Sequence, residues 1–210
     1  MKIAVIGSGN IGKSIGAWAS MVGYDVMFSS KNSEHSREAA KGAGNNATSG
    51  SVRDAVTKAD MVLLAVPYPA VKEVLSDVGP LLKNKVLIDA TNALSADYSS
   101  LALGFTTSAA EEIEKLVPGA KVVKAFNTVF SSVYASKDPK IKGNKVAVFY
   151  AGDDAAAKAK VADLIIKMGF DAVDTGPLKA ARSLEPMALL NISLGYGLGH
   201  GTQIGFSFNR

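Results

Sequence analysis

A glycine-rich segment close to the start of the chain constrains the fold more than any other feature. An apolar run from Ile3 to Ile6 is followed by glycines at positions 7, 9 and 12, in the spacing G-x-G-x-x-G. This order predicts a buried strand that turns sharply into a helix whose free backbone amides face an anion. The glycines allow a pyrophosphate to approach the backbone. We therefore expect an α/β dinucleotide-binding fold, with a doubly wound, mainly parallel sheet and a cofactor site at Gly7, Ser8, Gly9, Asn10, Ile11 and Gly12.

The end of the second predicted strand bears on the type of dinucleotide. Residues 24–28 are predicted to form this strand, and Ser29, Ser30, Lys31 and Asn32 follow it. Folds that prefer NAD place an Asp or Glu here, which accepts hydrogen bonds from the ribose 2′-hydroxyl. Hydroxyl donors and a lysine would instead hold a 2′-phosphate, which a carboxylate would repel. The segment favours NADP over NAD, although an ordinary polar loop has a similar composition.

Three further apolar runs, 60–67, 85–90 and 121–126, have the character of central parallel strands. Ligands of such sheets bind outside the carboxyl ends of the strands, so we expect the nicotinamide beside these ends. Amide and hydroxyl side chains there would suit hydrogen bonds to a carboxamide, although Asn and Thr also favour turns after strands. The candidate residues at the three ends are Ala65, Val66 and Pro67, then Thr91 and Asn92, and finally Asn127 and Thr128.

Composition and charge exclude several classes of function. The net charge of +4 comes from scattered lysines, without the interleaved basic and aromatic residues of a nucleic-acid surface. The absence of cysteine rules out disulfides, thiolate metal sites and cysteine nucleophiles, and no metal site is expected. The apolar stretch 187–208 is interrupted by polar residues and glycines, so we expect no membrane association. Because no leader follows Met1, a cytoplasmic location is expected.

The remaining pattern predicts about eight strands that alternate with helices, without a repeat or a linker between them. A final helix over residues 180–198 is expected to be kinked or started by Pro186. We therefore expect an NADP-binding domain over residues 1–178. Residues 179–210 would form a small helical extension that packs on this domain and on a partner subunit.

Five segments together resemble the deazaflavin-dependent NADP oxidoreductases, also called NADPH:coenzyme F420 reductase-like proteins. They are residues 7–12, 29–31, 124–128, 174–177 and 185–192, and the resemblance runs from Met1 to Arg210. The cytosolic reductase domains of membrane ferric reductases are similar. The resemblance implies a Rossmann domain, a homodimer formed across the C-terminal extension, and NADPH that reduces a bound deazaflavin or flavin.

The resemblance also implies roles for individual residues. Ser8, Asn10 and Ile11 would lie along the pyrophosphate, Ser30 and Lys31 would hold the 2′-phosphate, and Val66 and Pro67 would flank the nicotinamide. Pro67, Asn92 and Asn127 would position the transferred hydride. Asn127 stands where archaeal members of the family carry a histidine, and Lys31-Asn32 replaces an arginine pair, which predicts a softer preference for NADP.

We therefore expect an oxidoreductase that transfers a hydride between NADP(H) and coenzyme F420 or a flavin, FMN or FAD, as second ligand. A flavin or ferric-chelate reductase and a non-enzymatic NADPH-binding redox sensor are the alternatives. Imine and carbonyl reductases normally add a long helical domain, for which this chain has only about one helix. His35 and His200, the two histidines, are expected to be surface or packing residues.

Overall fold

A computed structural model describes residues 1–44 and 46–210 and places one eight-stranded sheet at the centre of the fold. The strand order is β10-β9-β6-β5-β4-β1-β2-β3, and every neighbouring pair is parallel except β6 and β9. The strands are β1 (Lys2–Ile6), β2 (Asp25–Ser29), β3 (Thr48–Ser49), β4 (Met61–Leu64), β5 (Val86–Asp89), β6 (Lys121–Ala125), β9 (Ala147–Gly152) and β10 (Asp171–Asp174). The predicted doubly wound, mainly parallel sheet is confirmed. A separate hairpin joins β7 (Lys140–Ile141) to β8 (Asn144–Lys145).

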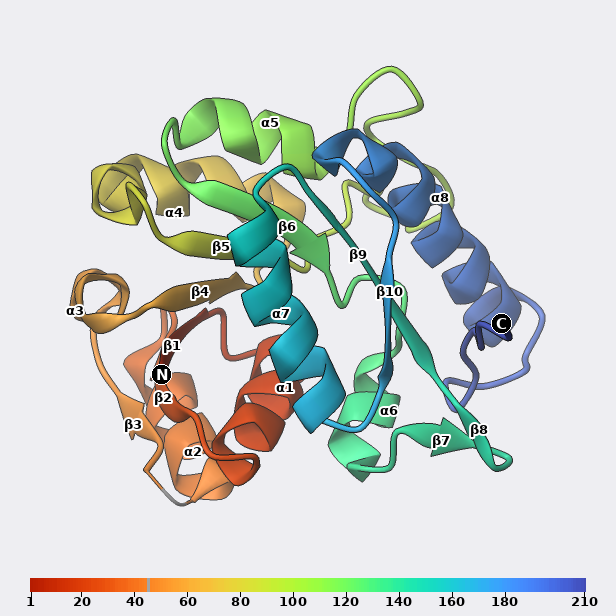
Figure 1. The fold of residues 1–210 in the computed structure, drawn as a ribbon, viewed down its shortest axis with the longest axis horizontal. Coiled ribbons are helices and arrows are strands. Elements are labelled where there is room, and N and C mark those ends of the chain that lie inside the picture. Colours follow the sequence, from red (N-terminus) through yellow and green to blue (C-terminus); the bar gives the residue numbers. More distant parts are fainter. Residues whose placement is uncertain (45) are drawn as a thin grey trace.

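Helices cover both faces of the sheet (Figure 1). They are α1 (Asn10–Met21), α2 (Ser33–Ala43), α3 (Val52–Lys58), α4 (Val71–Val78), α5 (Ala109–Leu116), α6 (Ser131–Ser136), α7 (Ala155–Lys167) and α8 (Ala181–Ile192). The buried residues of α1, α2, α6 and α7 share one apolar cluster, and those of α3, α4 and α5 share another. The sheet therefore separates two cores.

The central strands are apolar on both faces because each face contributes to one of these cores. In β1, Ile3 and Val5 belong to the first cluster, whereas Ala4 and Ile6 belong to the second. This alternation follows from the two-residue period of a strand. It explains why the central strands appear in the sequence as continuous apolar runs rather than as alternating patterns.

The strand order reverses next to β1, which pairs with β2 on one side and with β4 on the other. Ile6 at the end of β1 lies opposite Ser29 in β2 and Leu64 in β4. The three strands therefore end at the same edge of the sheet. In doubly wound folds, a reversal of this kind is where ligands bind.

The C-terminal segment differs from the helix predicted over residues 180–198. A 3₁₀ turn (Leu178–Ala180) precedes α8, Pro186 lies inside α8, and a π-helical turn (Ser193–Gly197) follows it. Gly195 allows this turn, because a Cβ there would lie 2.7 Å from the Phe130 ring. The tail then returns to the sheet, where the Ala147 amide donates to the Phe206 carbonyl oxygen at 2.8 Å. Figure 1 shows α8 alongside β9 and β10. Among the described residues, no helix is long and apolar enough to cross a membrane.

Gly16 is required where α1 packs on the sheet, because a Cβ there would lie 2.5 Å from the Phe28 ring. We expect Gly16→Ala to lower the free energy of unfolding by about 1–3 kcal/mol through overpacking, measured by urea denaturation. Gly42 in α2 is the matched control, since its added Cβ would meet nothing within 4 Å. Gly42→Ala should be neutral or stabilising by up to about 1 kcal/mol, from helix propensity. Equal effects of the two substitutions would contradict the packing argument.

Candidate cofactor-binding site

The three glycines of the first loop have different structural roles. Gly7 has a φ of 101°, and a Cβ there would lie 2.4 Å from the Ala65 carbonyl oxygen. A Cβ on Gly12 would lie 1.9 Å from the Gly7 carbonyl oxygen. These two glycines are therefore needed for the turn itself. Gly9 has an ordinary φ of −73°, and its Cβ would meet nothing within 4 Å. Gly9 thus leaves the backbone accessible to a ligand.

The N-terminus of α1 is suited to an anion. Gly9 is the N-cap residue and offers no side-chain cap, and the first turn contains no acidic residue. The first amides of the helix are therefore available to a ligand, and the helix dipole adds a partial positive charge. Ser8, just before the N-cap, has a buried Oγ without a hydrogen-bond partner among the described residues. This donor set fits a pyrophosphate.

Buried polar atoms without partners gather at the same edge of the sheet. In the described part of the chain they are Ser8 Oγ, Thr91 Oγ1, Asn127 Oδ1 and Thr128 Oγ1. All four follow β1, β5 or β6, and all four belong to residues predicted from the sequence. An unpaired buried polar atom costs about 1–3 kcal/mol, so native proteins keep few of them. Their concentration marks this edge of the sheet as the candidate binding site.

Asn92 and Asn127 are hydrogen-bonded to each other at the ends of the neighbouring strands β5 and β6. Asn127 Nδ2 donates to Asn92 Oδ1 and to the Leu184 carbonyl oxygen, both at 3.0 Å. Asn92 Nδ2 donates to the Asn127 carbonyl oxygen at 3.2 Å. The amide donors are thus used within the protein, and Asn127 Oδ1 remains as an acceptor. A ligand N–H, such as that of a carboxamide, would satisfy it.

The end of β4 lies against the glycine loop. The Ala65 amide donates to the Ile6 carbonyl oxygen at 2.8 Å, and the Ala65 carbonyl faces Gly7. Val66 is half-buried and Pro67 is exposed, and a 3₁₀ turn over Tyr68–Ala70 follows. The predicted residues of this strand end therefore stand next to the loop that would bind the pyrophosphate.

The polar residues at and after the end of β2 separate into two groups. Ser29 is buried, and its Oγ donates to the Val5 carbonyl oxygen at 3.1 Å, so it ties β2 to β1. Ser30 Oγ donates to the Asn32 carbonyl oxygen, and Asn32 caps α2. The Lys31 side chain is 93% exposed, with its Nζ 3.7 Å from Glu73 Oε1. Lys31 therefore offers a charge at the surface, whereas the Ser29 hydroxyl does not face solvent.

A buried charge cluster below the strand ends was not predicted from the sequence. Lys124 Nζ lies 2.9 Å from Asp89 Oδ2 and 3.0 Å from Glu185 Oε1, and all three side chains are almost wholly inaccessible. Lys124 also donates to the Thr91 carbonyl oxygen. We call Lys124, Asp89 and Glu185 the buried triad. Its one signal in the sequence is a lysine inside an apolar strand, which rarely occurs without a charged partner.

The buried triad connects the C-terminal helix with the strand ends. Burial lowers the pKa of Lys124, but the two carboxylates outweigh burial and raise the pKa above its ordinary value. Lys124 is therefore charged. Glu185 in α8 also accepts from the backbone amides of Ala109 and Ala110, at the N-terminus of α5. Asn191 Nδ2 adds a second link from α8, to the Thr128 carbonyl oxygen at 3.1 Å.

The chemistry available at this edge is binding and orientation. His35 and His200 are both exposed and lie outside the residues described above. No group of three or more His, Asp or Glu side chains suited to a metal ion occurs among residues 1–44 and 46–210. The arrangement provides backbone amides, hydroxyls and one amide oxygen, which are groups that hydrogen-bond to a polar ligand.

Removal of the buried ammonium should be strongly destabilising, because two carboxylates would remain buried without a cation. We expect Lys124→Met to lower the free energy of unfolding by about 3–5 kcal/mol at neutral pH, measured by urea denaturation. Lys115→Met is the matched control, since Lys115 pairs with Glu112 on the surface of α5. This control should unfold like the unmodified protein. Similar stability of the two variants would show that Lys124 is not required to balance the buried carboxylates.

Comparison with known proteins agrees with this geometry. A family model described as NADP oxidoreductase, coenzyme F420-dependent, matches residues 2–93. The F420-dependent NADP reductase of Methanothermobacter thermautotrophicus is 29% identical, over 92% of this chain and 89% of that protein. The metalloreductase STEAP3 of Rattus norvegicus is 28% identical over 90% of this chain, which spans only 36% of that protein.

A solved structure resembles this chain over its whole length. A candidate F420-dependent NADP reductase from Arthrobacter sp. FB24 superposes with a TM-score of 0.89, at 27% identity, and covers 100% of both chains. The fold, the glycine loop and the sequence relatives therefore point to the same kind of protein. Over residues 2–93 the chain matches the family described as coenzyme F420-dependent NADP oxidoreductases, and over its whole length it is similar to proteins named F420-dependent NADP reductases.

Proposed function

We propose that this protein transfers a hydride between NADP(H) and a second ring, a deazaflavin of the coenzyme F420 type or a flavin. The observation that supports this most directly is the gathering of unpartnered polar atoms at Ser8, Thr91, Asn127 and Thr128. They lie at the carboxyl-end edge of the sheet, with Ser8 at the point where the strand order reverses, and dinucleotides bind along this edge in such sheets. The relatives named F420-dependent NADP reductases support the class of acceptor.

The cofactor would lie across the ends of β2, β1, β4, β5 and β6. The amides of the glycine loop and Ser8 would hold the pyrophosphate, with Gly9 giving the closest approach. Ser30 and Lys31 would hold the 2′-phosphate, above the Ser29 hydroxyl that ties β2 to β1. The carboxamide would meet Thr91, Asn92, Asn127 and Thr128, with its N–H donating to Asn127 Oδ1.

In hydride transfer, the role of the protein would be to orient the nicotinamide ring. When bound, the nicotinamide supplies the hydride. Val66 and Pro67 would flank one side of this ring, while the pair formed by Asn92 and Asn127 fixes its carboxamide. Orientation of this kind holds the reacting carbons in contact, without a nucleophile or a metal.

The C-terminal extension, residues 179–210, would pack both on the NADP-binding domain of residues 1–178 and on a second subunit. Large apolar side chains are exposed along it, with 53% of Leu190 and 70% of both Tyr196 and Leu198 accessible. Burial of such side chains between two copies would remove them from water. This supports a homodimer.

A flavin or ferric-chelate reductase that uses free FMN or FAD is the second candidate. The identity of 28% with a protein named metalloreductase, over 90% of this chain, favours it. The same edge of the sheet would serve both functions, because both require NADPH beside a second flat ring. The two candidates therefore differ only in the acceptor.

The acceptor can be identified by turnover. We expect the protein to oxidise NADPH, followed by loss of nicotinamide absorbance, when coenzyme F420 or FMN is added. Oxidation with F420 alone supports the first candidate, and oxidation with FMN alone supports the second. Tight NADPH binding without turnover of either acceptor would instead indicate a redox sensor.

The 2′-phosphate assignment predicts a selective effect of Lys31. We expect Lys31→Ala to weaken NADPH binding by about tenfold and NADH binding much less, because only NADPH carries the phosphate. Titration of both nucleotides by calorimetry gives the comparison. Lys41→Ala, which removes the same charge from the last turn of α2, should leave both affinities unchanged. Equal weakening of NADPH and NADH by Lys31→Ala would rule out this phosphate contact.

A further inference from the structure

The buried triad carries a net charge. Lys124 contributes one positive charge, and Asp89 and Glu185 contribute one negative charge each. Asp89 accepts hydrogen bonds from Lys124 and from the Thr91 amide. Glu185 pairs with Lys124 and accepts hydrogen bonds from two amides of α5. All of these partners are donors, and a carboxylate without a proton can accept from each of them. The N-terminus of α5, a helix of eight residues, offsets part of the excess. A buried negative charge remains.

This charge lies directly behind the end of β5. Lys124 Nζ donates to the Thr91 carbonyl oxygen, and the Thr91 amide donates to Asp89 Oδ1 at 2.9 Å. The triad thus binds both polar groups of the Thr91 backbone, while Thr91 Oγ1 stays without a partner. Glu185 follows Leu184, whose carbonyl oxygen fixes Asn127. The triad therefore hydrogen-bonds to Thr91 directly and reaches Asn127 through Leu184, the residue before Glu185.

The negative potential of the cluster extends to the end of β4. Tyr68, the residue after Pro67, has a pKa raised first by burial and then by the charges of Glu112, Glu185 and Asp89. Lys124 opposes these charges but does not cancel them. Two members of the triad thus act on the residue beside the ring position that we assign to the nicotinamide.

We propose that the buried triad favours the oxidised nicotinamide, which is a cation, over the reduced ring, which is neutral, and that Glu185 supplies the deciding charge. This inference rests on the proposed function, because it requires the nicotinamide at the ends of β4, β5 and β6. A negative charge stabilises a nearby cation by Coulomb attraction, and burial of the charge reduces the screening by water. The bound NADPH would then be a stronger hydride donor than free NADPH. The C-terminal extension would thus tune the cofactor as well as cover it.

Glu185→Gln tests the proposal, because it removes one negative charge and leaves the pair formed by Lys124 and Asp89 in place. We expect the dissociation constant of NADP⁺ to rise about three- to tenfold relative to that of NADPH. Binding of 2′,5′-ADP, which lacks the nicotinamide, should not change. Calorimetry measures all three ligands, and thermal unfolding checks that the variant is folded.

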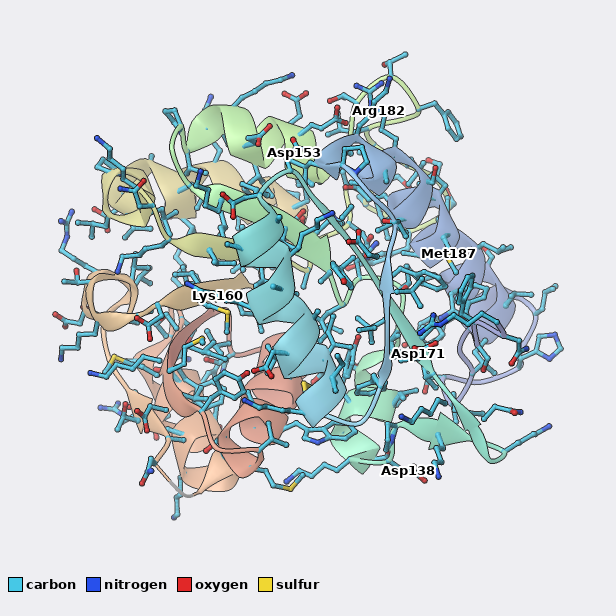
Figure 2. All side chains as sticks on the ribbon, viewed as in Figure 1. Asp138, Asp153, Lys160, Asp171, Arg182 and Met187 are labelled. Atoms are coloured by element: carbon cyan, nitrogen blue, oxygen red, sulfur yellow. The ribbon has the colours of Figure 1, made fainter. Side chains whose placement is uncertain are left out.

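Three further variants separate charge from packing. Glu185→Asp keeps the charge and should keep the native ratio of the two affinities. Asp89→Asn removes the other carboxylate. It should shift the ratio of the NADP⁺ and NADPH dissociation constants in the same direction as Glu185→Gln, so one of the two variants is sufficient if the other does not fold. Glu111→Gln is the matched control. It breaks the contact between α5 and Arg182, which Figure 2 labels in the first turn of α8, and should leave the ratio unchanged.

The outcomes are distinct. Equal weakening of NADP⁺ and NADPH by Glu185→Gln would overturn the proposal, because the triad would then only position residues. A shift of the same size in Glu111→Gln would also overturn it, since any contact between α5 and α8 would suffice. If the unmodified protein binds neither NADP⁺ nor NADPH, the proposed function itself fails, independently of the ratio.

Discussion

The pairing of the Lys124 ammonium with two buried carboxylates is the interaction on which the candidate site depends. It joins β5, β6 and α8, and through Glu185 it also reaches the N-terminus of α5. These elements are brought together at the edge where the strands end. A buried ion pair contributes little net stability by itself, because the lost hydration offsets the attraction. Its geometry nevertheless admits few alternative arrangements, since any shift would leave a buried charge unpaired.

Next to this cluster, the strand ends carry buried polar atoms that have no hydrogen-bond partner in the described part of the chain. The donors of Asn92 and Asn127 are used within the protein, whereas Asn127 Oδ1 and three hydroxyl oxygens are not. In the proposed function, the fixed support below and these buried polar atoms above would form a preorganised binding site, because little side-chain order remains to be gained on binding. The glycine loop follows the same pattern, with Gly7 and Gly12 closely packed and Gly9 open.

Such a site accounts for relatives that are named for different acceptors. In the proposed function the glycine loop and the strand ends contact the dinucleotide, and hydride transfer needs only that a second ring be held in contact with the first. The F420-dependent NADP reductase and the metalloreductase match this chain over 92% and 90% of its length, respectively. The choice of acceptor therefore need not alter the glycine loop or the strand ends. It would depend on the surfaces around the second ring, which include the C-terminal extension.

The sequence by itself determined the features that depend on local patterns. The spacing of the glycines predicted the strand, the turn and α1, and continuous apolar runs predicted the central strands with Asn92 and Asn127 at their ends. Tertiary structure alone decided the features that join distant positions. Lys124 and Asp89 are 35 residues apart, and Glu185 lies 75 residues beyond Ala110, so no local period reveals their contacts. It also turned the Ser29 hydroxyl inward and placed Pro186 inside α8. The physical reason is that a hydrogen-bond partner or a buried charge is fixed by packing across the whole chain, whereas strands and caps follow from neighbouring residues.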